Sequence, residues 1–399
     1  MPRLEDELND SEPGGPKRRP LTQLTQAGRS PSITGAFVNP PVIHASTVLF
    51  PDVASMKPGG QPYVYGRVGT PTTEALESAM TELEGAAGTV LCPSGLSAIS
   101  TALLSVLASG DHLLMADNVY DPARTVATTI LARFGVETTF FDPKIGGGIA
   151  ALMRPNTRAV YAESPGSLTF EITDLPALAA SAHANDALLI VDNTWATPFF
   201  CKPLALGADI SLLAGTKYIG GHSDLMFGTV SAAPSAFPRL RESYLALGLC
   251  VGPDDIFLAL RGLRTLGVRL ERHMRSGLEV ATFLKGRPEV AEVLHPALPT
   301  HPGHGLWRRD MSGASGLFGV VLDGWSAEKT ASFLEALQIF GLGYSWGGFE
   351  SLAIPARLNR TATDWQAKGP LIRLHVGLED TADLIADLEA AFARVGNLA

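Results

Sequence analysis

The sequence predicts an α/β protein with a mostly parallel, seven-stranded sheet, helices on both faces of that sheet, and a smaller C-terminal α+β domain. Three observations carry this prediction. Short apolar runs alternate with helical stretches between residues 71 and 255. The runs are continuously apolar, as burial on both faces requires. Beyond residue 255 the alternation stops. Strand–helix–strand units at this spacing imply right-handed crossovers and a parallel sheet.

Each element has its own signal in the sequence. A helix at 71–85 has an acidic start, an apolar face and a terminal glycine. The expected strands are 89–92, 112–116, 137–141, 158–162, 187–191, 209–213 and 228–231. The helices expected between them include 96–107, 122–134 and 175–184. The second domain is expected to contain a long helix at 256–284, strands within 315–323 and 371–380, and an amphipathic helix at 382–395.

Length and composition set the domain organisation. At 399 residues the chain exceeds the size at which a single core stops growing, so two domains are expected. Residues 1–20 are rich in charge, proline and glycine and are expected to be a disordered tail. Residues 21–70 lack a clear period and are expected to form an extended arm that packs on something else. The large domain is expected at 71–255 and the small one at 256–399.

Charge and cysteine content exclude several classes of function. The net charge is −9, from 31 basic and 40 acidic residues, and the folded part holds no strongly basic block. Nucleic acid and anionic membranes are therefore not expected partners. No apolar run approaches the length of a membrane span, and the N-terminus does not resemble a signal peptide. Cys92, Cys201 and Cys250 cannot all pair and have no ligand spacing, which favours a reducing, cytoplasmic location.

The strongest chemical signal is Lys217, in the segment 209–224 (DISLLAGTKYIGGHSD). The apolar strand ends before Gly215, so Thr216 and Lys217 lie at the carboxyl end of a strand, where open α/β sheets bind ligands. Lysine forms Schiff bases with carbonyl compounds, and burial lowers its pKa toward that use. The alternative is an ordinary lysine whose stem packs on the sheet while its amine reaches water.

Three further segments lie at or near strand ends. Ser94, Gly95 and Leu96 begin a helix and could bind an anion such as phosphate, or could simply form a tight turn. Tyr120 could stack on a flat ring or be a surface aromatic residue. Asp192 follows five apolar residues and needs a cation or donor: a metal, a helix start or a protonated ring nitrogen. Metal is disfavoured because no other ligands cluster there.

The strand at 371–376 carries Arg373 and His375 on one face. Arginine in an apolar strand requires an anion, either a bidentate substrate carboxylate or a structural ion pair. For His375, a packed or hydrogen-bonded histidine is favoured. The histidines of HPALPTHPGHG, residues 295–305, have irregular spacing and are not expected to bind metal. Together, a phosphate cradle, a stacking tyrosine, an acid for a ring nitrogen and a Schiff-base lysine indicate one cofactor, pyridoxal phosphate.

These residues lie within motifs that resemble the Cys/Met-metabolism group of fold-type I pyridoxal-phosphate enzymes, which share the aspartate aminotransferase-like fold. The similarity is greatest to the bacterial cystathionine β-lyases and extends from residue 21 to the end. The motifs are YGRVGTPT, PSGLSA, DNVYDPAR, AESPGS, VDNTWATP, GTKYIGGHSD, RGLRTLGVRL, HPALP, GYSWGGFESL and LIRLHVGLEDTADLIADL.

The resemblance assigns roles to individual residues. It implies that Lys217 holds the cofactor aldehyde, Asp192 pairs with the pyridine nitrogen and Tyr120 stacks on the ring. Phosphate would be bound by the backbone of Gly95 and Leu96, the Thr216 hydroxyl, and Tyr65 and Arg67 of a neighbouring subunit. Arg373 would bind the substrate carboxylate, and the substrate site would include Tyr344, Ser345 and Trp346. A homodimeric catalytic unit, doubled to a tetramer, follows from the same resemblance, and no metal does.

The implied reaction is α,β-elimination of L-cystathionine to L-homocysteine, pyruvate and ammonia, a carbon–sulfur lyase step of transsulfuration and methionine biosynthesis. Lys217 would remove the α-proton, and Lys217 or Tyr120 would protonate the sulfur. The alternatives are a broader cysteine-S-conjugate β-lyase, a cystathionine or methionine γ-lyase, a γ-synthase, or an inactive binding protein.

Four positions depart from the wider group's pattern. Ala214 replaces a serine that binds phosphate, and Ser167 replaces an asparagine that contacts the ring. The usual SLGG becomes SWGG at 345–348, and this change, like that at Ser167, points to a β-lyase. Val68 stands where some bacterial β-lyases have a second arginine, which leaves substrate breadth open.

Overall fold

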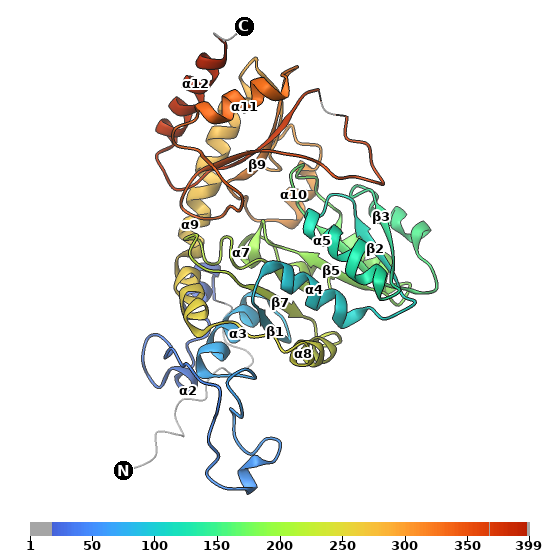
Figure 1. Ribbon diagram of the computed structural model, residues 1–399, viewed down its shortest axis with the longest axis vertical. Helices are drawn as coiled ribbons and strands as arrows, with labels where there is room; N and C mark the ends of the chain where they lie inside the picture. The colour runs from blue at the N-terminus through green and yellow to red at the C-terminus, as the bar shows by residue number, and fades with distance from the viewer. Residues whose placement is uncertain (1–17, 367, 397–399) are drawn as a thin grey trace.

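A seven-stranded sheet forms the centre of the large domain in the computed structural model, which describes residues 18–366 and 368–396 (Figure 1). The strand order is β1-β7-β6-β5-β4-β2-β3. The strands are β1 (Gly88–Cys92), β2 (His112–Ala116), β3 (Glu137–Phe141), β4 (Thr157–Glu163), β5 (Leu188–Asp192), β6 (Ile210–Leu213) and β7 (Gly228–Ala232). Each predicted strand is present, with ends shifted by at most one residue.

Six of the seven strands run in one direction, which confirms a mostly parallel sheet. β2, β3, β4, β5 and β6 pair in parallel, whereas β7 is antiparallel to both of its neighbours, β6 and β1. The physical reason is the connection: β7 follows β6 through residues 214–227 without a crossover helix, so the chain must turn back on itself. That turning segment carries Lys217.

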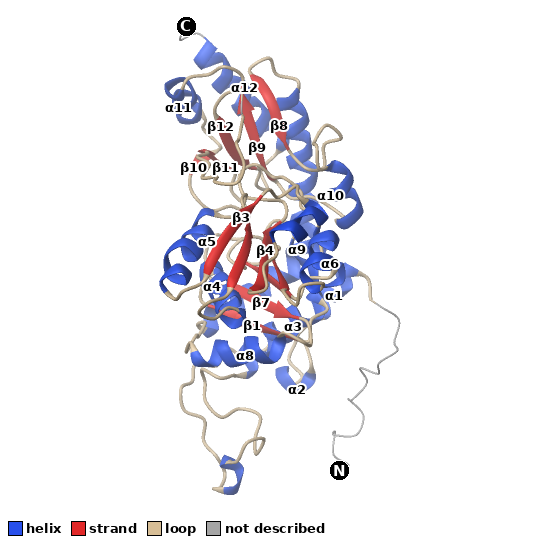
Figure 2. Cartoon of the chain, turned by 90° about the vertical axis from the view of Figure 1, so that its right-hand side faces the viewer, coloured by secondary structure: helices blue, strands red, loops and turns tan. Residues whose placement is uncertain are grey.

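Helices cover both faces of the sheet, as Figure 2 shows for α4 and α5 on one side and α6 and α9 on the other. The helices of this domain are α3 (Pro71–Glu84), α4 (Gly95–Val106), α5 (Asp121–Thr125), η2 (Val126–Leu131), η3 (Gly146–Leu152), α6 (Leu175–His183), α7 (Thr197–Phe200), η4 (Pro203–Leu206) and α8 (Phe237–Ala246). α3 shows how sequence sets their bounds. Thr70 caps its start by accepting from the Thr73 N–H, and Gly85 ends it in the left-handed conformation.

The N-terminal segment differs from the expectation of a wholly extended arm. Residues 20–34 form α1 (Pro20–Gln26) and α2 (Pro31–Thr34), and α1 packs on the protein's own α9. Arg264 fixes α1 by donating to the carbonyls of Leu24 and Ala27, both at 2.8 Å. Beyond residue 35 the chain forms long loops, interrupted by η1 (Ala54–Met56), that extend away from the small domain (Figure 1). Residues 1–17 of the expected disordered tail lie outside the described residues.

The small domain is built on a second sheet, with strand order β10-β11-β12-β9-β8. Its strands are β8 (Val290–Leu294), β9 (Leu317–Leu322), β10 (Gly341–Leu342), β11 (Leu352–Pro355) and β12 (Leu371–His375). Its helices are α9 (Pro253–Lys285), α10 (His304–Asp310), α11 (Ala327–Ala336) and α12 (Thr381–Gly396). α9 contacts α1 and α3 as well as β8 and α12, and so joins the two domains.

The core positions the site through buried strands. All residues of β1, β2, β6 and β7 are buried, and so are those of β9 and β12. Apolar residues of the large sheet, of α9 and of the small sheet form three buried clusters. Within residues 18–366 and 368–396, no helix combines the length and apolarity that crossing a membrane requires.

Candidate active site

The carboxyl ends of the parallel strands meet at the edge of the large sheet that faces the small domain. Glu163 ends β4 and Asp192 ends β5, and these two residues are register partners on adjacent strands. Tyr120 comes shortly after β2, and Lys217 shortly after β6. The topology therefore gathers four of the chemistry-bearing positions at one edge, as expected for an open α/β sheet.

Lys217 is half-buried and makes contact with the small domain. Its Nζ donates to the Ser345 Oγ at 2.6 Å and lies 5.6 Å from the centre of the Trp346 ring. Burial, together with the charge of Arg373, lowers the pKa of Lys217 to about 8, while the charge of Asp192 opposes the change. The amine is thus neutral in a substantial fraction of molecules near neutral pH, which is the nucleophilic form.

Asp192 is held in place by the next turn of the chain. Its Oδ1 accepts from the Thr194 N–H at 2.9 Å and from the Thr194 hydroxyl, and that hydroxyl accepts from the Ala214 N–H at 2.9 Å. Its Oδ2 has one long contact, 3.5 Å to the Tyr161 hydroxyl. Burial raises the pKa of Asp192, while the Thr194 donors and Lys217 oppose this rise. Asp192 is therefore a buried acid with one oxygen still available to a donor.

Tyr120 is anchored through its backbone and leaves its ring free. Its N–H donates to Glu163 Oε2 at 2.7 Å, and its side chain is 48% exposed. Burial raises the pKa of the Tyr120 hydroxyl, and the charges of Glu163 and Asp192 raise it further. Burial and the neighbouring Asp192 also raise the pKa of Glu163 well above its ordinary value. Because Asp192 has the better donors, the negative charge of this carboxyl pair resides on Asp192.

The start of α4 lies against the end of β6. A Cβ on Gly95 would lie 2.4 Å from the Ala214 Cβ, so glycine is required there. Ser94 caps the helix by accepting from the Ser97 N–H at 3.0 Å, which leaves the N–H groups of Gly95 and Leu96 for a ligand. The Thr216 hydroxyl exchanges hydrogen bonds with the backbone of Phe227, at 3.1 and 3.2 Å. A phosphate would therefore compete with Phe227 for the Thr216 proton.

The residues expected to bind substrate lie on β12 and on the loop 344–348. Arg373 is 9% exposed; its Nη2 donates to the Ser345 carbonyl at 2.8 Å, and its Nε is buried without a partner among the described residues. Burial lowers the pKa of Arg373 to about 10, so its guanidinium stays charged at neutral pH. Trp346 packs against Tyr218, with ring centres 5.4 Å apart. Tyr344 is 88% exposed and belongs to the rim.

Tyr65 and Arg67 do not join this cluster within one chain. Arg67 Nη1 donates to the Leu245 carbonyl in α8 at 3.2 Å, and Tyr65 pairs with Thr47 in an isolated bridge. Both belong to the segment whose loops extend away from the small domain (Figure 1). Two of the positions that depart from the wider group's pattern also lie in different places. The Ser167 N–H donates to the carbonyl of Asn118, two residues before Tyr120, whereas Val68 directly follows Arg67 in the sequence.

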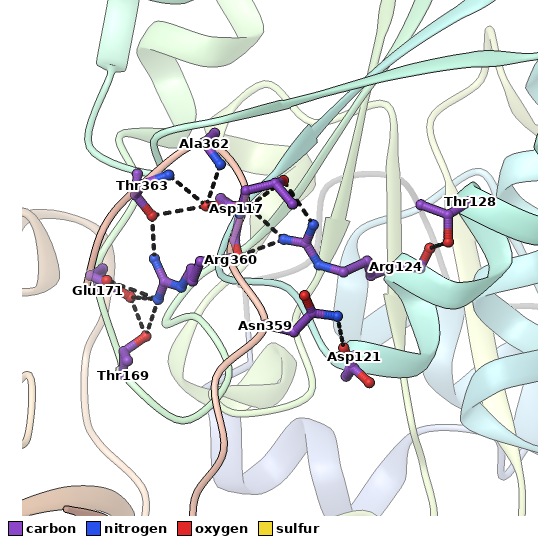
Figure 3. A network of polar contacts seen from close by, with 11 residues as sticks. Asp117, Asp121, Arg124, Thr128, Thr169, Glu171, Asn359, Arg360, Ala362 and Thr363 are labelled. Carbon is purple, nitrogen blue, oxygen red and sulfur yellow. Dashed lines mark hydrogen bonds and ion pairs between the residues drawn. The ribbon is translucent and has the colours of Figure 1, made fainter.

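A polar network that the sequence analysis did not predict holds the loop that carries Tyr120 (Figure 3). We call residues 356–366 the strap; they leave β11 and cross to the large domain. The Asp117 carboxylate accepts from the N–H groups of Thr361, Ala362 and Thr363 at 2.8–3.2 Å and pairs with Arg124 at 2.5 Å. Because Asp117 is three residues before Tyr120, the strap holds the loop that carries Tyr120.

The second half of the network ties the strap to residues near Ser167. Arg360 Nη2 contacts the Glu171 carboxylate at 3.0 Å and the Thr169 hydroxyl at 2.5 Å (Figure 3). Asn359 donates to Asp121 at 3.0 Å, at the start of α5. These contacts join residues that are 189 to 238 positions apart in the sequence, so no local pattern could reveal them. Glu163 and Thr194, in contrast, follow strand ends within the AESPGS and VDNTWATP motifs and could have been found there.

The arrangement suits amine and carbonyl chemistry on a bound organic group. It combines a lysine of lowered pKa, a buried acid, an unstacked aromatic ring, a helix N-terminus and a buried arginine. In the described part of the chain, His, Cys, Asp and Glu do not gather in a group of three or more that could hold a metal ion. His295, which is fully buried, accepts from the Ala297 N–H at 3.2 Å through its Nδ1.

The chain is similar to known proteins over nearly its whole length. The model of the family described as "Cys/Met metabolism PLP-dependent enzyme" matches residues 21–393. A putative cystathionine beta-lyase of Rhizobium johnstonii is 53% identical over 377 residues, covering 93% of this chain and 95% of that protein. Cystathionine beta-lyase MetC of Escherichia coli K12 is 44% identical, covering 94% of this chain and 98% of that protein. The crystal structure of metB from Corynebacterium glutamicum gives a TM-score of 0.88 at 33% identity, covering 96% and 99% of the two chains.

Proposed function

The chain belongs to the family of Cys/Met metabolism PLP-dependent enzymes, and we propose that it is a carbon–sulfur lyase that converts L-cystathionine to L-homocysteine, pyruvate and ammonia. The family membership confirms the resemblance inferred from the motifs. The observation that supports the proposal best is the contact between Lys217 and Ser345, which places a lysine of lowered pKa beside the Ser345-Trp346-Gly347-Gly348 sequence of a β-lyase.

The residues present fit pyridoxal phosphate. Gly95 leaves room where any larger side chain would meet Ala214, and the free N–H groups of the α4 N-terminus suit a phosphate. The Oδ2 of buried Asp192, whose one hydrogen bond is the 3.5 Å contact with the Tyr161 hydroxyl, suits a protonated ring nitrogen. The Tyr120 ring is free to stack on the pyridine. When bound, the cofactor supplies an aldehyde for an amine and a conjugated ring that accepts electrons from the Cα of the substrate.

Each side chain of the site then has its own role in the reaction. Arg373 binds the substrate carboxylate, for which its buried, unpartnered Nε is available. Lys217, once free as an amine, removes the proton from the substrate Cα. The Ser345 Oγ, 2.6 Å from the Lys217 Nζ in this structure, is placed to orient that amine. Asp192, which carries the negative charge of its pair with Glu163, keeps the ring nitrogen protonated.

Breaking the Cβ–S bond requires a proton at sulfur. The conjugate acid of Lys217 holds the proton taken from Cα and can return it to the leaving thiolate. Tyr120 is the second candidate, because burial and the nearby carboxyl pair of Glu163 and Asp192 keep its hydroxyl protonated at neutral pH. Homocysteine leaves, and hydrolysis of the remaining three-carbon fragment gives pyruvate and ammonia, so that one water is consumed for each cystathionine.

A second copy of the chain is part of the proposal. The loops beyond residue 35 expose large apolar side chains, among them Leu49 at 86%, Val53 at 81% and Phe37 at 76%. Such a surface is typical of an interface between subunits. Because Tyr65 and Arg67 lie on this segment and not beside Lys217, we propose that they reach the phosphate of a neighbouring subunit in a homodimer or dimer of dimers.

Cys92, Cys201 and Cys250 are free thiols, which supports a cytoplasmic location.

The test is to incubate the purified, cofactor-loaded protein with L-cystathionine and identify the keto acid. The proposal predicts pyruvate with an equal amount of homocysteine. Accumulation of 2-oxobutyrate with cysteine would instead assign a γ-lyase. The Lys217→Ala variant is expected to lose turnover; turnover near the wild-type rate would remove Lys217 from the mechanism.

A further inference from the structure

The loop 344–348 is pressed onto the backbone of the candidate catalytic lysine. A Cβ on Gly347 would lie 2.9 Å from the carbonyl carbon of Lys217 and from the N of Tyr218. Gly347 has φ +88°, and Ser345, which is not glycine, has φ +76°. A serine in that region is conformationally costly and persists only where neighbouring contacts hold it. The loop therefore needs contacts that hold it in this conformation, which we call anchors. In this conformation the Ser345 hydroxyl lies at the Lys217 Nζ.

β12 supplies two anchors to this loop. Arg373 donates from Nη2 to the Ser345 carbonyl at 2.8 Å, and the His375 Nε2 accepts from the Gly347 N–H at 3.0 Å. The two side chains are two residues apart on one strand and so share one face. They hold the loop at alternate residues, on either side of Trp346.

The hydrogen bond to Gly347 defines the state of His375. Nε2 also lies 3.2 Å from the Gly348 carbonyl, and Nδ1 has no partner among the described residues. The contact with the Gly347 N–H is the shorter of the two; because a backbone N–H can only donate, it forms when Nε2 is unprotonated and the ring hydrogen is on Nδ1. The ring is 0% exposed and packs beside His273 and Tyr218, with centres 5.3 and 6.0 Å away. Burial, with the neighbouring His273, holds the pKa of His375 well below its ordinary value, so the ring is neutral. In the tautomer protonated at Nδ1, the acceptor for the Gly347 N–H is therefore present throughout the physiological pH range.

The two anchors differ in what substrate does to them. If the proposed function is right, the Arg373 guanidinium is shared with the substrate carboxylate and must adjust as substrate binds and product leaves. His375 is fully buried behind the loop, where its contact with Gly347 does not involve substrate. We propose that His375 is a positioning residue of the lyase: through Gly347 it fixes the loop 344–348, and with it the Ser345 hydroxyl at Lys217, independently of substrate.

The test compares two amide side chains that differ in reach. In His375→Gln the amide oxygen can occupy the position of Nε2 and accept from Gly347, whereas in His375→Asn the amide ends near the position of Nδ1 and cannot. We expect kcat/KM of the Asn variant to fall by about 10- to 100-fold, the loss that an unpaired buried N–H produces, with KM rising. The Gln variant should stay within about threefold of wild type.

A measurement without turnover accompanies the kinetics. The visible absorption of the cofactor-loaded protein, titrated with pH in the absence of substrate, reports the surroundings of Lys217. The Asn variant should shift its midpoint, and the Gln variant should keep that of wild type. Thermal unfolding checks that both variants are folded; if the Asn variant is not, His375→Leu, which also lacks the acceptor, takes its place.

Two results would overturn the proposal: an Asn or Leu variant with wild-type kinetics and titration, or a folded Gln variant damaged as severely as the Asn variant. In either case, wild-type production of pyruvate would leave the proposed function standing. A wild-type protein that yields no keto acid would instead refute the proposed function, while the absorption titration would still report on His375.

Discussion

Asparagine at position 117 is expected to release the strap from the large domain. The Asp117 carboxylate is 1% exposed and accepts from three consecutive N–H groups of the strap and from Arg124 (Figure 3). Asparagine has the same shape, but one of its terminal groups is a donor that faces other donors. It also leaves the buried Arg124 without its counter-charge. The change therefore removes the interaction without creating a large cavity.

The size of the effect follows from the pKa. Hydrogen bonds from Thr361 and Arg124, acting against the desolvation caused by burial, lower the pKa of Asp117 from 3.8 to about 2. A depressed carboxyl pKa means that the contribution to stability is fully present above the ordinary value and is lost as pH falls through about 2. At neutral pH it amounts to about 2.5 kcal/mol. Leaving Arg124 unpaired can raise the total loss to about 5 kcal/mol.

Trypsin provides the assay, because the strap contains Arg357 and Arg360. Where opening is fast relative to cleavage, the rate follows the population of the open strap. A loss of about 2.5 kcal/mol then predicts cleavage at least about fiftyfold faster in Asp117→Asn than in wild type. The control is Glu137→Gln, which removes an exposed pair with Arg154 and should leave strap cleavage unchanged. Cleavage of Asp117→Asn within about threefold of wild type would refute the reasoning.

Two further predictions concern cofactor binding. In Gly95→Ala the new Cβ would lie 2.4 Å from the Ala214 Cβ, so cofactor affinity measured by equilibrium dialysis should fall at least about tenfold. Adding Ala214→Gly to this variant should partly restore the affinity. The control Gly305→Ala, whose Cβ meets open space, should have no effect. Failure of the double variant to recover any affinity would count against this contact. The rate of cofactor capture by the cofactor-free protein should rise with pH, with a midpoint of about 8, the pKa of Lys217. Because the charge of Arg373 lowers that pKa, Arg373→Met should move the midpoint upward. A wild-type midpoint near 10.5 would contradict the lowered pKa.

Much of the large domain could be predicted because its strands are buried on both faces. A run such as 209–213 is apolar without alternation, and a short segment of that kind fits a strand covered by helices on each side. The reversal of β7 was not evident, since direction depends on the connection and not on the strand's own residues. In the small domain, β9 and β12 were predicted, but β10 has two residues and β8 is partly exposed, so neither has a strong signal.

The site divides in the same way. Asp192 is the last residue of β5, and Lys217 and Tyr120 lie a few residues beyond strand ends. The end of an apolar run is readily recognised in a sequence, so these positions could be predicted. Their supports are long-range: Asp117 meets the strap 244 residues later, and His375 meets Gly347 28 residues away. The prediction of His375 as a packed or hydrogen-bonded histidine captured its burial, but the sequence did not identify Gly347 as its partner. Contacts of this kind depend on how two domains are placed, which local patterns do not encode.

The assignment of Lys217 as the residue that holds the cofactor is tested most directly by trapping the linkage. Borohydride reduction of the cofactor-loaded protein converts a lysine–aldehyde linkage into a stable amine, and peptide mass spectrometry then locates it. The account predicts the mass of the reduced cofactor on the peptide that contains Lys217. The same mass on another lysine, such as Lys202, or on none, would contradict it.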